Sequence, residues 1–99
     1  MPARLNPIRP GEILREDFMR PLGLSMNALA RGLGVPPNRI SAILSGRRAI
    51  TADTALRLEH YFGVSAQTWL NLQSSYELRV AQRRAGARIA RTVKPRAAA

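Results

Sequence analysis

Residues 25–45 decide the fold, and they read SMNALARGLGVPPNRISAILS. Two short helices that cross at a tight turn need a small side chain where they touch, and Ala30 supplies one. Four residues later the turn needs a positive φ, which Gly34 adopts without steric cost. The inner face of the second helix then carries the branched side chains of Ile40 and Ile43. Because one short window meets all these requirements, it predicts a helix-turn-helix, with an ordinary corner of a structural helix bundle as the alternative.

The limits of both helices are marked in the sequence. Ser25 is a favourable N-cap, and Gly34 ends the helix that Ser25 begins. Pro37 suits the first position of the second helix, which ends at Gly46. The side chains expected in the small core are Leu29, Ala30, Leu33, Val35, Ile40, Ile43 and Leu44.

Helix signals continue on both sides of the motif. Before it, the stretch 10–12 (PGE) predicts a helix start and Pro21 a helix end, with three inward side chains between them: Ile13, Leu14 and Phe18. After it, Thr51 caps a fourth helix that ends at Gly63, and Ser65 caps a long fifth helix. No alternating strand pattern is present. The expected fold is therefore all-α, a five-helix domain with a long C-terminal helix.

The chain divides into three expected segments. Residues 1–9 form a proline-containing N-terminal arm, and residues 10–85 form the helix-turn-helix and dimerisation domain. From about Gly86 the chain is rich in Ala and Arg without a clear apolar stripe. Residues 86–99 are therefore expected to be a basic, disordered tail.

The charge balance is strongly basic, with 16 Lys and Arg against 6 Asp and Glu and a formal net charge of +10. This excess predicts a polyanionic partner, and nucleic acid is the one that a basic chain without a membrane segment favours. The alternative is the coding bias of a GC-rich genome, since Lys94 is the only lysine. With no signal peptide and no membrane-length apolar run, we expect a cytoplasmic protein, associated with the nucleoid when bound to DNA.

The residues that carry enzyme chemistry are sparse. The chain has no cysteine, and His60 is its single histidine. No nucleophile–base pair, phosphate-binding glycine loop or metal-ligand cluster emerges. We therefore expect no enzyme activity, metal or cofactor. The acids are scattered over helix starts and exposed faces: Glu12, Glu16, Asp17, Asp53, Glu59 and Glu77.

The outward side chains of the motif's second helix suit contacts with base edges. Asparagine can bond to adenine and arginine to guanine through two hydrogen bonds, and alanine can touch a thymine methyl group. The predicted DNA-facing residues of this helix are Pro37, Asn38, Arg39, Ser41, Ala42 and Ser45. Two alternatives stay open: Arg39 as a phosphate contact or solvated surface, and Asn38 as a partner of backbone groups near the helix start. Phosphate contacts are expected around the helix from Ser25, Asn27, Arg47 and Arg48.

The apolar stripe of the fifth helix has two interpretations, an intramolecular core and a seam between two copies. A domain this small rarely needs so long an amphipathic helix, and DNA-binding dimers mirror the symmetry of their operators. The stripe therefore favours a homodimer, with its interface at Trp69, Leu72, Tyr76 and Val80.

Five stretches follow one another in register: PGEIL (10–14), PLGLS (21–25), PPNRI (36–40), RAITADTALRL (48–58) and WLNLQ (69–73). Together they resemble the HigA group of antitoxins, within the lambda-repressor-like (Cro/C1, XRE-type) helix-turn-helix family. The resemblance spans roughly residues 8 to 84. At the start of the motif's first helix the family commonly has glutamine, where this chain has Met26.

The resemblance implies a homodimer that binds double-stranded operator DNA, represses its own operon and neutralises a RelE/HigB-type mRNA-cleaving toxin. Such a toxin is expected to be basic, so the acids of the first helix and the N-terminal arm are the expected toxin surface: Glu12, Glu16 and Asp17. Two alternatives remain, a stand-alone repressor without a toxin and a non-specific nucleic-acid binder that uses its basic tail.

Overall fold

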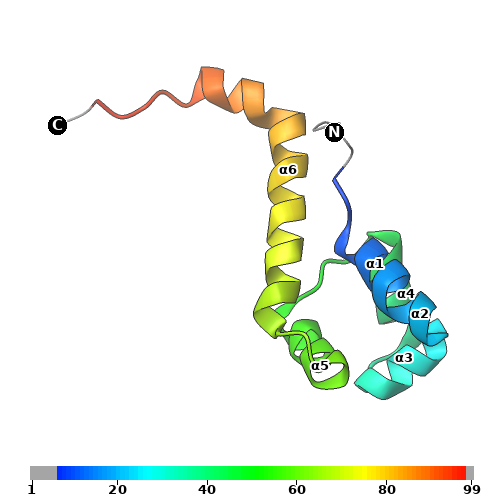
Figure 1. Cartoon of the computed structure of the whole chain (residues 1–99). Helices are drawn as coiled ribbons and strands as arrows, with labels where there is room; N and C mark the ends of the chain where they lie inside the picture. The colour runs from blue at the N-terminus through cyan, green and yellow to red at the C-terminus, as the bar shows by residue number, and fades with distance from the viewer. Residues whose placement is uncertain (1–6, 98–99) are drawn as a thin grey trace.

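The computed structural model describes residues 7–97, and within that range all regular structure is helical. The helices are α1 (Pro10–Ile13), the π-helix η1 (Leu14–Met19), α2 (Arg20–Leu22), α3 (Met26–Leu33), α4 (Pro37–Ser45), α5 (Ala52–Phe62) and α6 (Ala66–Thr92). The first three are consecutive and form one helical stretch, so the expected all-α architecture is confirmed (Figure 1). Of the expected N-terminal arm, residues 1–6 lie outside the described residues.

The end of the first helical stretch differs from the prediction at Pro21. In η1 the hydrogen bonds span five residues, and the N–H of Arg20 donates to the carbonyl of Arg15. Pro21 follows in the first turn of α2, where a missing N–H is tolerated. The stretch ends instead at Gly23, whose φ of 64° is left-handed, and Leu24 N–H donates to the Met19 carbonyl at 2.9 Å.

The helix starts predicted from capping residues are confirmed. The hydroxyl oxygen of Ser25 accepts a hydrogen bond from Ala28 N–H at 3.0 Å. Thr51 and Ser65 cap α5 and α6 in the same way, at 3.4 Å and 3.1 Å. Each such cap satisfies a backbone donor that the helix itself leaves unpaired.

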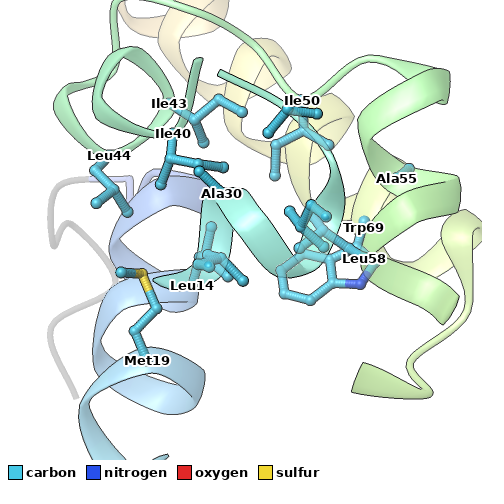
Figure 2. Packing of buried hydrophobic residues seen from close by; sticks show 13 residues of the cluster. Leu14, Met19, Ala30, Ile40, Ile43, Leu44, Ile50, Ala55, Leu58 and Trp69 are labelled. Atoms are coloured by element: carbon cyan, nitrogen blue, oxygen red, sulfur yellow. The ribbon is translucent and has the colours of Figure 1, made fainter. Parts of the chain in front are cut away.

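One aliphatic core joins the helices, and Figure 2 shows its packing. Leu14 from η1, Ile40 from α4 and Trp69 from α6 have no exposed surface. The aromatic rings of Phe18 and Phe62 lie on the same core, and Phe18 stands 5.0 Å from Trp69 between ring centroids. The buried apolar residues are Leu14, Met19, Leu29, Ala30, Leu33, Val35, Ile40, Ile43, Leu44, Ile50, Ala55, Leu58 and Trp69.

The burial of Trp69 corrects one sequence interpretation. Its side chain was expected at a dimer interface, but it fills the chain's own core and exposes nothing to a partner. Helical spacing alone could not separate these two roles, because a core face and an interface face show the same apolar period.

α1 and α4 pack backbone against backbone at Gly11. A Cβ atom added at this position would collide with the carbonyl oxygen of Ile43. The absence of a side chain at Gly11 therefore lets the first helical stretch lie directly on α4.

α6 is longer than expected and extends well beyond the other helices (Figure 1). It continues through Thr92, so the predicted disorder of the segment that begins at Gly86 is wrong for residues 86–92. Extending an existing helix needs only residues of good helix propensity, and Ala and Arg are among the best. Within residues 7–97, no helix combines the length and apolar character needed to cross a membrane.

Candidate nucleic-acid interface

The turn between α3 and α4 is fixed by its glycine and by an arginine from α5. Gly34 has a φ of 70°, and Val35 N–H donates to the Ala30 carbonyl at 3.0 Å. Arg57 then donates through Nη1 to the Leu33 carbonyl at 2.8 Å and to the Gly34 carbonyl at 3.3 Å. Carbonyls at a helix C-terminus attract cations, so Arg57 fastens the end of α3 to α5.

α4 has one buried face and one polar face. Ile40, Ile43 and Leu44 enter the core. Pro37, Asn38 and Ser45 are exposed, whereas Ser41 and Ala42 are half-buried. An exposed helix face with short polar side chains is the arrangement that reads bases in a DNA major groove.

Two of the predicted residues at the end of α4 bond to each other. The Ser45 hydroxyl donates to the Ala42 carbonyl at 3.1 Å and accepts from Arg47 Nε at 3.0 Å. These bonds hold Arg47 against the last turn of α4, and Arg48 is exposed beside it. Arg47 and Arg48 are thus both exposed in the loop that follows α4.

The N-terminal end of α3 offers hydrogen-bond donors to a phosphate group of a DNA strand. Ser25 and Asn27 are both exposed. The Ser25 oxygen already accepts the capping bond from Ala28, but a hydroxyl that accepts still has its own proton to donate. A helix N-terminus of this kind attracts a phosphate group.

Arg39 departs from the predicted picture. Its guanidinium does not stand free on the polar face but forms an ion pair with Asp53 of α5, at 3.1 Å between Nη1 and Oδ2. The side chain is only 23% exposed. Asp53 Oδ2 also accepts from Arg57 Nε at 2.9 Å. The hydrogen bond from Arg57, more than the one from Arg39, holds the pKa of the Asp53 carboxyl below its usual value.

Sequence reasoning missed three residues that hold α4 in place: Arg9, Asp53 in this role, and Arg57. Arg9 donates through Nη2 to the Leu44 carbonyl at 3.3 Å, at the C-terminal end of α4. The spacing of Asp53 and Arg57 could have indicated an ion pair within one helix. No local sequence rule pairs Arg39 with Asp53, which lies 14 positions further along the chain.

The predicted dimer residues on α6 fall into three groups. Trp69 is buried in the core, and Leu72 packs partly against it. Tyr76 and Val80 are half-buried and line a groove of about 540 Å³ on α6. The other residues of this groove are Glu77, Ala81, Arg84, Ala85 and Arg88. The apolar part of the groove thus continues the predicted stripe beyond the core.

Two short helices joined by a glycine turn, with a polar outer face on the second, define a helix-turn-helix domain. The family model described as "Helix-turn-helix" matches residues 14–69. The chain therefore belongs to the helix-turn-helix family, in its HigA-type antitoxin branch.

The chain is similar to three known proteins over most of its length. Virulence-associated protein I of Dichelobacter nodosus is 56% identical over 82 residues, which cover 83% of this chain and 72% of that protein. An addiction module antidote protein of the HigA family from Coxiella burnetii is 47% identical, with a TM-score of 0.87 over 93% of this chain and 100% of that one. The Pseudomonas aeruginosa antitoxin HigA, in a structure with the higBA promoter, is 45% identical, with a TM-score of 0.87 over 90% and 97%.

Proposed function

We propose that this chain is a homodimeric, sequence-specific repressor that binds the operator of its own operon. The observation that carries the proposal is the exposed polar face of α4, which stands next to the arginines of the following loop. The structure of the P. aeruginosa relative with promoter DNA supports it. A repressor acts where the DNA is, so we expect this chain in the cytoplasm, on the nucleoid.

In this proposal α4 enters the major groove and its surroundings hold the phosphates. Asn38 is suited to adenine, and the half-buried Ala42 presents a methyl group to thymine. Arg47 and Arg48 at one end, and the α3 N-terminus with Ser25 at the other, face the backbone strands. The apolar side of α4 stays in the core throughout.

The test is binding to the DNA upstream of the chain's own reading frame, compared with a scrambled duplex of equal length. We expect a preference of about a thousandfold or more for the operator. Asn38→Ala is expected to weaken operator binding by about 1–3 kcal/mol and to relax the choice of base at one position. Equal affinity of the unaltered protein for both duplexes would contradict the proposal.

The dimer is proposed to form along α6, where Tyr76 and Val80 line the groove. The two α4 helices of a dimer enter successive major grooves only if the half-sites of the operator lie about 34–36 Å apart, or a multiple of that distance. Val80→Glu places a charge in the groove without touching the buried core, so light scattering is expected to show monomers of normal helicity. A Val80→Glu protein that remains dimeric and binds operator normally would move the interface elsewhere.

We further propose that the chain neutralises a RelE/HigB-type, mRNA-cleaving toxin. The description of the C. burnetii relative as an antidote protein supports this. Glu12, Glu16 and Asp17 are exposed on the first helical stretch. Glu16 is paired with Arg20 at 3.0 Å, which leaves Glu12 and Asp17 as the main acidic groups for a basic partner.

Co-expression with the neighbouring reading frame tests this second proposal. We expect the neighbour to arrest growth alone and to be harmless together with this chain. A neighbour that is not toxic, or whose toxicity is unchanged, would leave the stand-alone repressor as the function.

A further inference from the structure

A single carboxylate oxygen connects three helices around the helix-turn-helix. Asp53, in the first turn of α5, accepts from Arg39 of α4 at 3.1 Å and from Arg57 of its own helix at 2.9 Å, both through Oδ2. Arg57 in turn donates to the Leu33 carbonyl at the end of α3. α3 and α4 are thus joined to α5 by one continuous chain of polar contacts.

We propose that Asp53 and Arg57 are positioning residues for operator recognition, which set the orientation of α4 through Arg39 and the α3 carbonyls. In this proposal Arg39 contributes to base specificity by holding α4 in place through its ion pair with Asp53, and it does not bind guanine directly. The inference rests on the proposed operator binding and deepens it.

The charges around Asp53 predict what happens to Arg39 and Arg57 when the Asp53 carboxylate is neutralised. Two guanidinium groups converge on one carboxylate, so removal of its charge leaves Arg39 and Arg57 as neighbouring cations that repel each other. Arg39 belongs to the first turn of α4, and Arg57 remains bonded to the end of α3. The repulsion therefore acts between α4 and the α3–α5 unit and tilts the helix that faces the DNA.

The opposite end of α4 is held independently. Arg9 donates to the Leu44 carbonyl at 3.3 Å, and a side chain added at Gly46 would meet the Arg9 side chain. Loss of the Asp53 contact is therefore expected to pivot α4 about its C-terminal end rather than release it. A pivot displaces the base-facing side chains while leaving the loop arginines near the phosphates.

Direct reading of guanine by Arg39 predicts the reverse response. If Arg39 had to leave Asp53 in order to bind a base, the carboxylate would compete with the DNA for the guanidinium. Neutralisation of Asp53 would then release Arg39 and strengthen operator binding. The two roles of Arg39 therefore predict opposite changes in the preference for operator DNA when Asp53 is neutralised.

The experiment compares Asp53→Asn with Glu59→Gln, a matched control in the same helix, where the glutamine oxygen can still accept the hydrogen bond from Ala66 N–H. Both substitutions remove one negative charge, so both raise affinity for any DNA, and the ratio of operator to scrambled-duplex affinity isolates positioning. We expect Asp53→Asn to lower this ratio about tenfold, a change typical of residues coupled in one network. Glu59→Gln is expected to leave the ratio unchanged.

A double-variant cycle tests whether Arg39 acts through Asp53. We expect Arg39→Gln combined with Asp53→Asn to lower the ratio no further than Arg39→Gln alone, and Asp53→Glu, which keeps the charge, to recover part of it. Arg57→Lys repeats the test at a different residue, because lysine cannot make the contacts of both Nε and Nη1. Circular dichroism and retained binding to the scrambled duplex show that the variants are folded.

An Asp53→Asn protein with an unchanged or raised ratio would overturn the inference, as would full additivity in the double variant. Failure of the operator proposal itself has a different signature. In that case the unaltered protein would already show no preference for the operator, and no variant would be needed to see it.

Discussion

The compact part of the molecule, residues 10–72, and the distal half of α6 are both helical, but for different reasons. In the compact part η1, α3, α4, α5 and the start of α6 contribute side chains to one core, and Leu14, Ile40 and Trp69 are completely buried. In the distal half Leu78 and Ile89 are 60% and 48% exposed, and residues 87–97 are all exposed. The first region is held by burial of apolar surface, and the second by the helix propensity of its residues.

The two regions also differ in charge. The acids end at Glu77, whereas basic residues continue to the end of the described chain: Arg79, Arg83, Arg84, Arg88, Arg91, Lys94 and Arg96. The compact part pairs acids with arginines at defined positions, as at Asp53. The same residue type, arginine, thus organises a site in one region and gives the other region its net positive charge.

The largest expected effect is a difference in stability: a substitution in the core of the compact part should destabilise the fold far more than one in the distal half of α6. Trp69→Ala removes a fully buried ring from the core and is expected to lower the free energy of unfolding by about 3–5 kcal/mol. Ile89→Ala, on the exposed distal helix, is expected to change it by no more than about 0.5 kcal/mol. Urea titrations followed by circular dichroism measure both. Similar losses for the two variants would remove the distinction between the regions.

The substitution of glycine by alanine is expected to lower stability at Gly11 and to raise it at Gly86. Gly11→Ala introduces a methyl group that collides with the Ile43 carbonyl, and we expect a loss of about 1–3 kcal/mol in unfolding free energy. Gly86→Ala meets no atom within 4 Å. In the helix interior this change is expected to add about 0.5–1 kcal/mol of local stability. Thermal melts should therefore shift down for Gly11→Ala only, while helicity rises for Gly86→Ala.

The DNA interface is expected to end with the compact part. Arg48→Ala should weaken binding to operator and scrambled duplex alike and reduce the salt slope by about one unit, because one phosphate contact is lost. Arg91→Ala, in the last turn of α6, which leads away from the α3–α4 turn (Figure 1), is expected to leave the slope unchanged. An equal reduction of the slope by Arg91→Ala would extend the interface along the distal helix.

The smallest expected effect is a response to acid. The pKa of Asp53 is lowered in the folded chain, so its ion pairs stabilise the fold above the ordinary pKa of the carboxyl and this contribution disappears as pH falls through the lowered value. Because the side chain is 58% exposed, solvent screening keeps the effect small. Melting temperatures measured from pH 6 down to about pH 3 should fall slightly less for Asp53→Asn than for the unaltered chain. Parallel curves would show that the ion pairs add no stability.

The sequence predicted well what depends on neighbouring residues. The caps at Ser25, Thr51 and Ser65, and the inward positions of α3 and α4, follow from rules that span four residues or fewer. The helical stretch continues past Pro21 because the π-helix before it changes the hydrogen-bond register, which no local signal in the sequence marks. The helix over residues 86–92 was not predictable from an apolar stripe, because a helix that extends beyond the core needs none.

The site was less predictable than the fold. Exposure of Asn38 and Arg48 agreed with their helix and loop positions, but the engagement of Arg39 by Asp53 depends on how α5 packs beside α4. Likewise, the burial of Trp69 depends on its packing against residues of other helices, such as Phe18 of η1. Residues that act through tertiary partners carry no signature in a single sequence.

The division of α4 into two faces has an evolutionary consequence. Its core side chains constrain the fold, whereas Asn38 and Ser45 on the exposed side contribute nothing to core packing. Duplicated copies of this chain can therefore acquire new operator preferences through substitutions at the exposed positions at little cost in stability. Arg39 is the exception on this helix, since any replacement there also has to satisfy Asp53.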